Sequence, residues 1–386
     1  MKYVGRRARY GVPAVALLAV GAAAWVPTLS GASAPPDLPS QSVTQLLADV
    51  AKAQPPQVSG SLTWTADLGL SDLSTLENGA GQSAGGSASS ATSGFDPLTV
   101  LSGSHEIDVW LDGAKAEHLA LLLPPAEEVD LVRNGDQVWL WDSSSDTATH
   151  LVGPQTTGSG TTSAPSAPVG PALTPQQLAS RLLSHLSATT SLTTGDPLYV
   201  AGQPAYQLIV APKSAVGSTV DHIEIDVGAS GPLAGVPLQV AVYAQGQTAA
   251  ALELGFTGTL HLGPPPAGEL SFTPPPGARV VTHDLTAGRT AGEPANSGAL
   301  ADHGQFGGLR QTGTGWATVI TGPSSELAAQ TQQGALSEGT TAVEFGGQYG
   351  RLFSTVLLNV LVLPDGRFYA GLVTPGVLEA DASSGS

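Results

Sequence analysis

The sequence predicts an α+β protein built on an antiparallel sheet, and three observations support this prediction. Between residues 105 and 152, short alternating segments are separated by turn-forming pairs such as Asp112-Gly113 and Asn134-Gly135. These pairs supply the positive φ angles of tight hairpin turns, so a meander of consecutive strands is expected. Stretches with helical spacing lie on both sides of it. Glycine (48) and proline (30) make up about a fifth of the 386 residues, which favours short strands over long helices.

A first helix is expected over residues 42–53, with Ser42 as its cap. A strand follows over residues 58–70. After the meander, a second helix is expected to begin at Thr174, because Pro175 suits the first helical position and Gln177 completes a capping box. The apolar stripes that support the two helices are Val43, Leu46, Leu47 and Val50 in the first, and Leu178, Leu182, Leu183 and Leu186 in the second.

The meander carries large apolar side chains on both faces of one strand. Trp139 and Trp141 are two residues apart and therefore share a face, while Val138 and Leu140 share the other. Each face must then be covered, either by protein or by a ligand.

A second set of strands is expected downstream of residue 205. The segments are residues 206–211, 221–227, 238–242 and 252–256, with a turn around Gly246, and a last strand at residues 270–272 ends the set before Pro274-Pro275-Pro276-Gly277.

Three stretches of Ser, Gly, Ala and Thr divide the chain, and we interpret residues 79–94 and 156–171 as loops and residues 283–315 as a linker. A small C-terminal α+β unit is expected over residues 316–380. It would contain a helix over residues 324–336, one covered strand over residues 352–363, and a return strand after Asp365-Gly366. A hairpin with one helix is marginal alone, so this unit is expected to dock on the larger sheet.

The first 34 residues have the order of an export signal. Basic residues precede an apolar run at residues 12–26, and Ala32-Ser33-Ala34 offers a cleavage site. Pro35 would hinder cleavage, so the segment is either a signal peptide or a signal anchor that contacts the membrane through residues 12–29. The chain has no cysteine, which excludes a lipid-modified N-terminal cysteine and any disulfide. We therefore expect an exported protein of the cell envelope, secreted or anchored at the outer face of the cytoplasmic membrane.

The charge balance excludes one class of partner. Acidic residues number 31 against 14 basic ones, for a net charge of −17. Nucleic-acid binding depends on Lys and Arg that neutralise phosphates, so no nucleic-acid partner is expected.

Four segments resemble the outer-membrane lipoprotein carrier family, LolA, and the N-terminal domain of the sigma-E regulator RseB/MucB. They are residues 109–113, 132–142, 237–246 and 272–278, and the resemblance covers residues 38–282. It implies a curved antiparallel sheet that forms an unclosed half-barrel, capped on its concave side by helices, with acyl chains held between them. RseB also has a smaller C-terminal domain, which residues 316–380 parallel in position without a matching motif.

The resemblance implies an apolar groove, and five aromatic residues are candidates for lining it. Burial of an acyl chain stabilises a complex by about 0.8 kcal/mol per CH₂, so binding needs shape and dryness more than polar chemistry. The alternative is that these residues are ordinary core aromatics without a role in ligand binding. The candidates are Trp64, Trp139, Trp141, Tyr243 and Phe256.

Catalytic patterns are weak throughout the sequence. Residues 81–85 spell a nucleophile elbow but lie in a Ser/Gly tract, where the required strand and helix are not expected. The eight histidines lack metal-binding spacing, and His222 beside Asp221 and Glu224 fits a solvated strand face. We expect no catalytic residue, no cofactor, no metal and no enzymatic activity.

Three functions therefore stay open. The first is an extracytoplasmic protein that binds a lipid or lipoprotein acyl chain in the groove. The second is an RseB-like sensor that acts through a membrane protein such as an anti-sigma factor. The third is a structural envelope protein whose sheet interior is filled by its own side chains.

Overall fold

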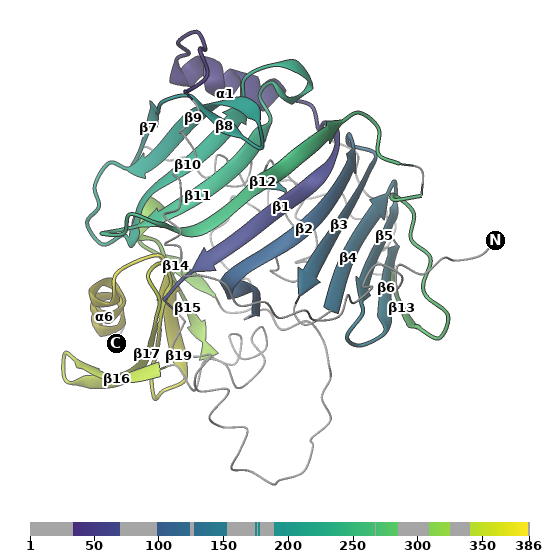
Figure 1. The fold of residues 1–386 in the computed structure, drawn as a ribbon. Helices are drawn as coiled ribbons and strands as arrows, with labels where there is room; N and C mark the ends of the chain where they lie inside the picture. The colour runs from purple at the N-terminus through teal and green to yellow at the C-terminus, as the bar shows by residue number, and fades with distance from the viewer. Residues whose placement is uncertain are drawn as a thin grey trace, which may run out of the picture. The chain divides into compact units, whose positions relative to one another are not determined.

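The computed structural model describes residues 34–69, 99–123, 127–152, 174–175, 177, 189–266, 268–284, 309–324 and 340–384. Most of them lie in two sheets, of which the larger has 13 strands (Figure 1). Across this sheet the strands are β13 (Arg279–Asp284), β6 (Thr147–Val152), β5 (Gln137–Asp142), β4 (Glu127–Asn134), β3 (Ala116–Leu123), β2 (Ser102–Asp112), β1 (Gln57–Asp67), β12 (Ala250–Leu262), β11 (Pro237–Ala244), β10 (Val220–Gly228), β9 (Gln203–Pro212) and β7 (Thr190–Thr194), with β8 (Leu198–Val200) paired to β9.

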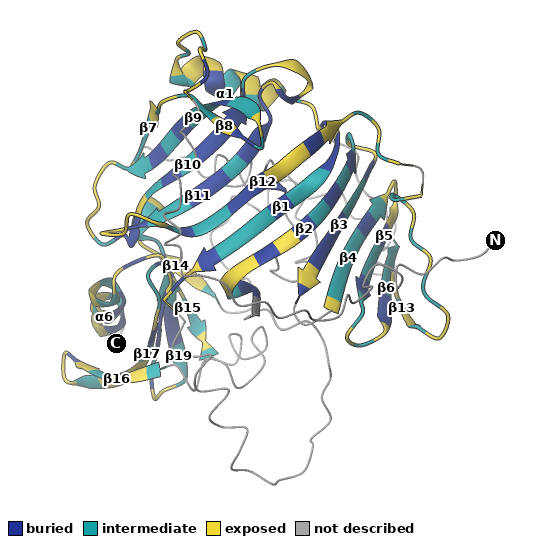
Figure 2. Ribbon diagram, viewed as in Figure 1, coloured by how far each residue is buried: buried dark blue, intermediate teal, exposed yellow. Residues whose placement is uncertain are grey.

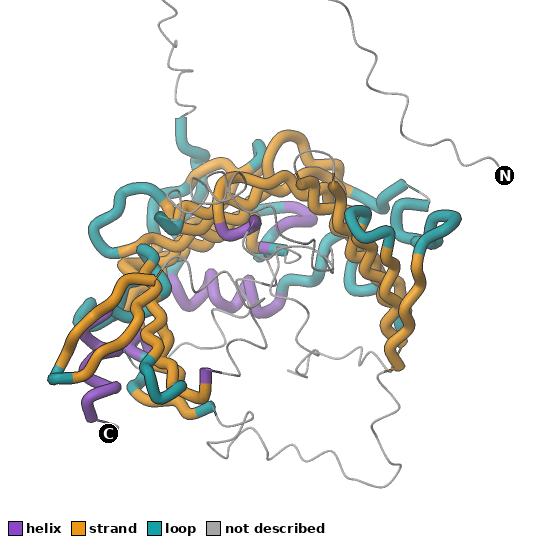
Figure 3. Tube along the Cα trace, turned by 90° about the horizontal axis from the view of Figure 1, so that it is seen from below, coloured by secondary structure: helices purple, strands orange, loops and turns teal. Residues whose placement is uncertain are grey.

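The predicted fold class, an open curved antiparallel sheet with helices, is confirmed. Neighbouring strands of the large sheet pair in antiparallel fashion except β13, which runs parallel to β6. The two edge strands, β13 and β7, are not paired with each other in the described part of the chain, so the sheet is not closed. Figure 3 shows the sheet bent into an arch.

The predicted meander is present as β2 to β6, each strand paired with the next. Its turns follow the expected chemistry, since Gly113 and Gly135 have φ angles of 60° and 58°. Residues with a Cβ rarely adopt positive φ angles, so these turns favour glycine.

Strand pairing gives the large sheet one apolar face. Leu62 of β1 pairs with Ile107 of β2 and with Phe256 of β12, and Ile107 pairs with Leu121 of β3. Directly paired residues point to the same side of a sheet, so these four side chains share a face. All four are buried, and Figure 2 shows buried positions between more exposed ones on these strands. In β2 the buried residues recur at every second position from His105 to Leu111.

Helix α1 (Val43–Lys52) identifies that face as the concave one. Leu46 of α1 is buried in one apolar cluster with Leu208, Ile225 and Val240 of the sheet, and Figure 3 shows α1 inside the arch. The predicted cap is present: the Ser42 side chain accepts a hydrogen bond from the Gln45 backbone, and the Gln45 side chain reaches back to Ser42. These bonds satisfy donors that the first helical turn leaves unpaired.

The second predicted capping box is also confirmed. Gln177 Oε1 accepts from the Thr174 backbone N–H at 2.9 Å, and Thr174 Oγ1 accepts from the Gln177 backbone N–H at 3.2 Å. The apolar stripe expected at residues 178–186 lies outside the described residues.

Residues 268–278, here called the strap, connect β12 to β13 at the far edge of the sheet. Figure 1 shows the green chain after β12 running past the ends of β3 and β5 to reach β13. The strap is held by two backbone carbonyls, Glu269 O on His118 Nδ1 at 2.8 Å and Leu270 O on Asn134 Nδ2 at 3.1 Å. The prediction of a strand at residues 270–272 is wrong, because these carbonyls bond to side chains instead of a strand ladder.

The C-terminal unit is a second sheet of six strands, which is more than the hairpin that the sequence indicates. The strands, in spatial order, are β14 (Arg310–Thr312), β15 (Val319–Pro323), β19 (Arg367–Gly371), β18 (Asn359–Val362), β17 (Gln348–Ser354) and β16 (Thr340–Phe345). Helix α6 (Pro375–Ser384), which the sequence did not predict, packs Leu378 and Ala382 onto this sheet.

The prediction of one strand over residues 352–363 is wrong. A turn at residues 355–358 divides the segment into β17 and β18, which pair with each other. The Thr355 backbone N–H donates to Leu358 O at 2.9 Å, and Thr355 Oγ1 accepts from the backbone N–H groups of Leu357 and Leu358. A threonine that bonds its own turn permits a reversal inside an apolar run.

The small sheet contacts the large one, as expected. Phe353, Leu357 and Val360 belong to the same apolar cluster as Leu208 and Ile223 of the concave face. Backbone bonds reinforce the contact, from Val356 N–H to Leu68 O at 3.2 Å and from Thr219 N–H to Leu372 O at 3.1 Å. The C-terminal strands therefore cover part of the concave face around β9 and β10.

Several sequence predictions fall outside the described residues. They are the export signal before residue 34, the loops at residues 79–94 and 156–171, most of the linker, and the helix at residues 325–336. At residues 310–312 the linker prediction is wrong, because β14 pairs there with β15 of the small sheet. Within the described ranges, no helix combines the length and apolar character needed to cross a membrane.

Candidate ligand-binding site

The concave face of β12, β1, β2 and β3 is a continuous apolar surface. Its central members are buried: Val58, Leu62, Ile107, Val109, Leu111, Leu119, Leu121, Leu254 and Phe256. Two of the predicted groove residues, Trp64 and Phe256, belong to this face. Trp64 is half-buried, and its indole Nε1 donates to Val100 O at 2.6 Å. The ring can thus expose its apolar surface without an unpaired N–H.

A small pocket opens beside Phe256, between the sheet and the turn that begins at Thr174. Its volume is ≈ 10 Å³, which is room for about one water molecule. The lining residues are mostly apolar: Pro56, Leu111, Thr174, Pro175, Val236, Pro237 and Phe256. The start of the helix at residue 174 therefore lies on the concave face at one end of the apolar surface.

Trp139 and Trp141 share a face with each other, as predicted, but not with Trp64 and Phe256. Trp139 pairs with Val132 and Trp141 with Asp130, whereas Leu131 of β4 packs in the concave core. Because neighbours along a strand point to opposite faces, both tryptophans lie on the convex side.

The strap covers the two tryptophans. The Phe272 ring lies 5.5 Å from the Trp139 ring and 6.2 Å from the Trp141 ring, centre to centre. His150 stacks on Trp139 with centres 4.0 Å apart and planes 2° from parallel. This part of the convex face is therefore covered by the protein itself. The sequence had left open whether protein or a ligand covers it.

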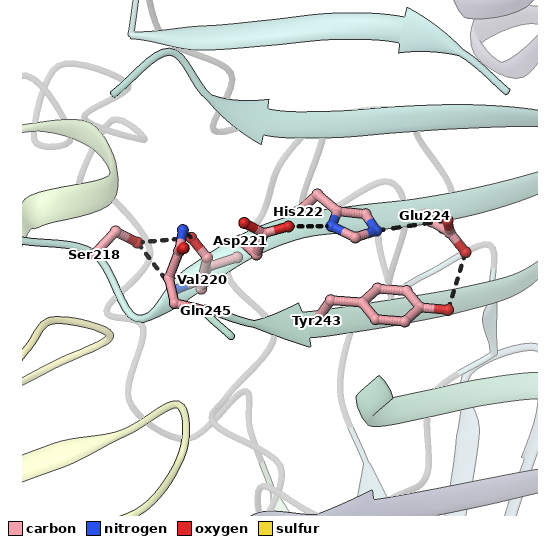
Figure 4. A network of polar contacts seen from close by, with 7 residues as sticks. All are labelled: Ser218, Val220, Asp221, His222, Glu224, Tyr243 and Gln245. Carbon is pink, nitrogen blue, oxygen red and sulfur yellow. Dashed lines mark hydrogen bonds and ion pairs between the residues drawn. The ribbon is translucent and has the colours of Figure 1, made fainter. Parts of the chain in front are cut away.

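Tyr243 also lies on the convex face, within a chain of polar contacts (Figure 4). Its hydroxyl donates to Glu224 Oε2 at 3.1 Å, and its ring stacks on His222. His222 lies between two carboxylates, with Nδ1 2.7 Å from Asp221 Oδ2 and Nε2 3.5 Å from Glu224 Oε1. The five predicted groove residues are thus divided between two faces, and their contact with a ligand stays a prediction.

Two groups of this polar region have shifted pKa values. Burial raises the pKa of Asp226 to about 7; the charges of Glu224 and Glu253 act in the same direction, while a hydrogen bond from Gln207 opposes them. Burial also raises the pKa of Tyr243 to about 12, assisted by the charge of Glu224. Among the described residues, no group of three or more His, Asp or Glu side chains is arranged to hold a metal ion.

One residue of the concave face escaped the sequence analysis. His105 of β2 is 7% exposed and points to the same side as Ile107, Val109 and Leu111. Its imidazole Nδ1 is buried and has no hydrogen-bond partner. The alternation along this strand could have identified it, because His105 occupies a position where the pattern predicts a buried apolar side chain.

Comparisons with known proteins give likenesses of fold only. No family model matches the sequence, and no curated protein matches it. The structure is similar to MucB in the MucA/MucB complex of Pseudomonas aeruginosa, with 16% identity, a TM-score of 0.38, and coverage of 87% of this chain and 94% of that chain. A crystal structure of MucB matches with 16% identity, a TM-score of 0.36, and coverage of 89% and 96%.

A LolA superfamily protein from Nitrosomonas europaea is similar as well, with 9% identity, a TM-score of 0.20, and coverage of 60% of this chain and 99% of that chain. These neighbours bear the same family names as the resemblance found in the sequence, LolA-like and RseB/MucB-like. With TM-scores below 0.5, the likenesses carry no argument about ligand or partner.

Proposed function

We propose that this chain is a non-enzymatic, extracytoplasmic binding protein that holds a lipid or lipoprotein acyl chain against the concave face of its half-barrel. The observation that supports the proposal is the small pocket between Phe256 and the helix start at Thr174 and Pro175, at the end of a continuous apolar face. Trp64 and Phe256 are the proposed contacts on that face. The N-terminal 34 residues would direct export, and residues 12–29 would contact the membrane if retained.

The energetics are adequate for such a ligand. Burial of a 16-carbon chain contributes on the order of 12 kcal/mol before the costs of ordering and lost freedom are subtracted. A pocket of ≈ 10 Å³ cannot hold it, since small-molecule sites occupy roughly 300–1,000 Å³. The described structure is therefore a closed form in this proposal, and Thr174 and Pro175 must move away from Phe256 when a chain enters.

The test is binding of a fluorescent fatty acid to the full chain, together with mass spectrometry of lipids that co-purify with it. Pro175→Trp places a ring much larger than the pocket against Phe256, so it should block an entering chain and weaken binding at least tenfold. The melting temperature of this variant shows whether the fold tolerates the larger side chain. Val280→Trp, on the half-exposed edge strand β13, is a matched control that should bind as wild type does. The carrier proposal fails if no lipid co-purifies and the probe binds neither wild type nor control.

A second candidate function is regulation through a protein partner, such as the anti-sigma factor implied by the RseB resemblance. The dense packing of the concave face favours it, because the described pocket accommodates about one water molecule. Cross-linking in envelope membranes should then capture a membrane protein, and capture should persist in Pro175→Trp. A carrier without such a partner would show lipid and no specific cross-linked protein.

A further inference from the structure

His105 places a polar ring in an otherwise aliphatic row on the concave face. It occupies the first buried position of β2, followed on the same side by Ile107, Val109 and Leu111. Its partner across the strand pair is Trp64 of β1. Any acyl chain that contacts Trp64 on this face would therefore pass close to the imidazole.

The hydrogen bonds of the His105 ring show which of its two nitrogens lacks a partner. Nε2 lies 3.0 Å from Ser102 O, and a carbonyl oxygen only accepts, so Nε2 carries the proton. In the neutral ring Nδ1 is then an acceptor, and it is buried without a partner. The nearby indole N–H of Trp64 does not supply the missing bond, because it donates to Val100 O.

An unpaired buried acceptor is destabilising, and the great majority of buried polar groups in native proteins are paired. A hydroxyl or amide N–H brought in by a ligand would supply the missing donor. A plain hydrocarbon chain would leave Nδ1 as unpaired as before. The same site can thus distinguish two ligands of nearly equal apolar area.

We propose that His105 is a specificity-determining residue of the acyl site, and that its Nδ1 selects acyl ligands with a hydrogen-bond donor on the chain, such as hydroxylated fatty acids. This inference rests on the proposed acyl-binding function. It adds the chemical class of the ligand, which the apolar face alone does not define.

The test is competition of stearate and of 2-, 10- and 12-hydroxystearate against a fluorescent fatty acid on the full chain. For wild type, at least one hydroxystearate is expected to bind about tenfold more tightly than stearate, or about 1.4 kcal/mol. His105→Phe keeps a ring without the acceptor, and it should bind all four acids within about twofold of one another. His105→Asn, whose Oδ1 can take the place of Nδ1, should retain part of the preference.

The outcomes separate this inference from the function on which it rests. Equal binding of all four acids to wild type overturns the role of His105 and leaves acyl binding intact. An equal preference in wild type and His105→Phe also overturns it. If His105→Phe raises the melting temperature while no preference exists in wild type, the unpaired nitrogen is only a structural defect. Failure of all four acids to bind wild type overturns both proposals.

Discussion

The two faces of the large sheet are covered in different ways. On the concave face, strands far apart in sequence bring aliphatic side chains together, and α1 and the C-terminal strands cover them. On the convex face, the β3–β6 side is covered by the strap through Phe272, whereas the β9–β12 side carries Glu224, Asp226 and Tyr243 in polar contacts. Alternation along a strand places different side chains on the two faces, and the segments that cover each face determine which of those side chains are exposed.

The largest expected effect is on the concave face. Leu62→Ala should lower the free energy of unfolding by about 2–5 kcal/mol, because Leu62 is fully buried and its loss leaves a cavity. The neighbouring Thr63→Ala, on the other face of β1, should lower it by no more than about 1 kcal/mol, because it removes one hydrogen bond between the Thr63 and Thr257 hydroxyls and leaves no large cavity. Urea denaturation of both variants measures the contrast, and equal losses would contradict the assignment of faces.

The next effect is a pH dependence that belongs to the convex face. The folded pKa of Asp226 lies near 7, above its ordinary value, so the folded state keeps a proton that the unfolded chain loses. Stability should therefore fall as pH rises from about 4 to about 7 and level off above, by on the order of 2–4 kcal/mol. Asp226→Asn should remove this slope and be the more stable protein at pH 8.

Urea denaturation at pH 5 and pH 8 measures the effect of Asp226. The matched control is Asp67→Asn, since Asp67 lies at the exposed end of β1. The control should keep the wild-type slope. A slope that survives in Asp226→Asn would assign the pH dependence to other groups.

The strap should matter less than the concave core. Phe272 is only partly buried, so Phe272→Ala should cost about 1–3 kcal/mol, below the usual range for a fully buried phenylalanine. Tryptophan fluorescence should shift to longer wavelength as Trp139 and Trp141 become exposed to water. Fatty-acid binding should stay unchanged, because these rings face away from the concave side. Lost binding would place them in the ligand site instead.

The smallest effect is expected at Tyr243. Tyr243→Phe keeps the stacking on His222 and removes one hydrogen bond to Glu224, so the loss should be about 0.5–1.5 kcal/mol. Fatty-acid affinity should again be unaffected. A drop in affinity would show that the convex polar region takes part in ligand binding.

Local signals in the sequence were reliable where the causes are local. The turns at Gly113 and Gly135 and the caps at Ser42 and Thr174 depend on residues within four positions of one another, and all four were predicted. The apolar run at residues 352–363 was misread because its turn contains neither glycine nor proline. The turn depends on Thr355 and on the side-chain hydrogen bond between Ser354 and Asn359. For the candidate site, the sequence assigned five aromatic residues to one groove, whereas the structure divides them between two faces; their contact with a ligand stays a prediction.

The sequence by itself determined the meander with its turns, the two helix caps and the sides that successive residues share, because these depend on backbone chemistry and on a period of two. Only the tertiary structure decided which side is concave, since an alternating strand reads the same from either face. It also decided that the strap covers Trp139 and Trp141, and that His105 is enclosed without a partner. Those outcomes depend on pairs such as Leu62 with Phe256 and His118 with Glu269, which lie far apart in the chain and meet only when the sheet is complete.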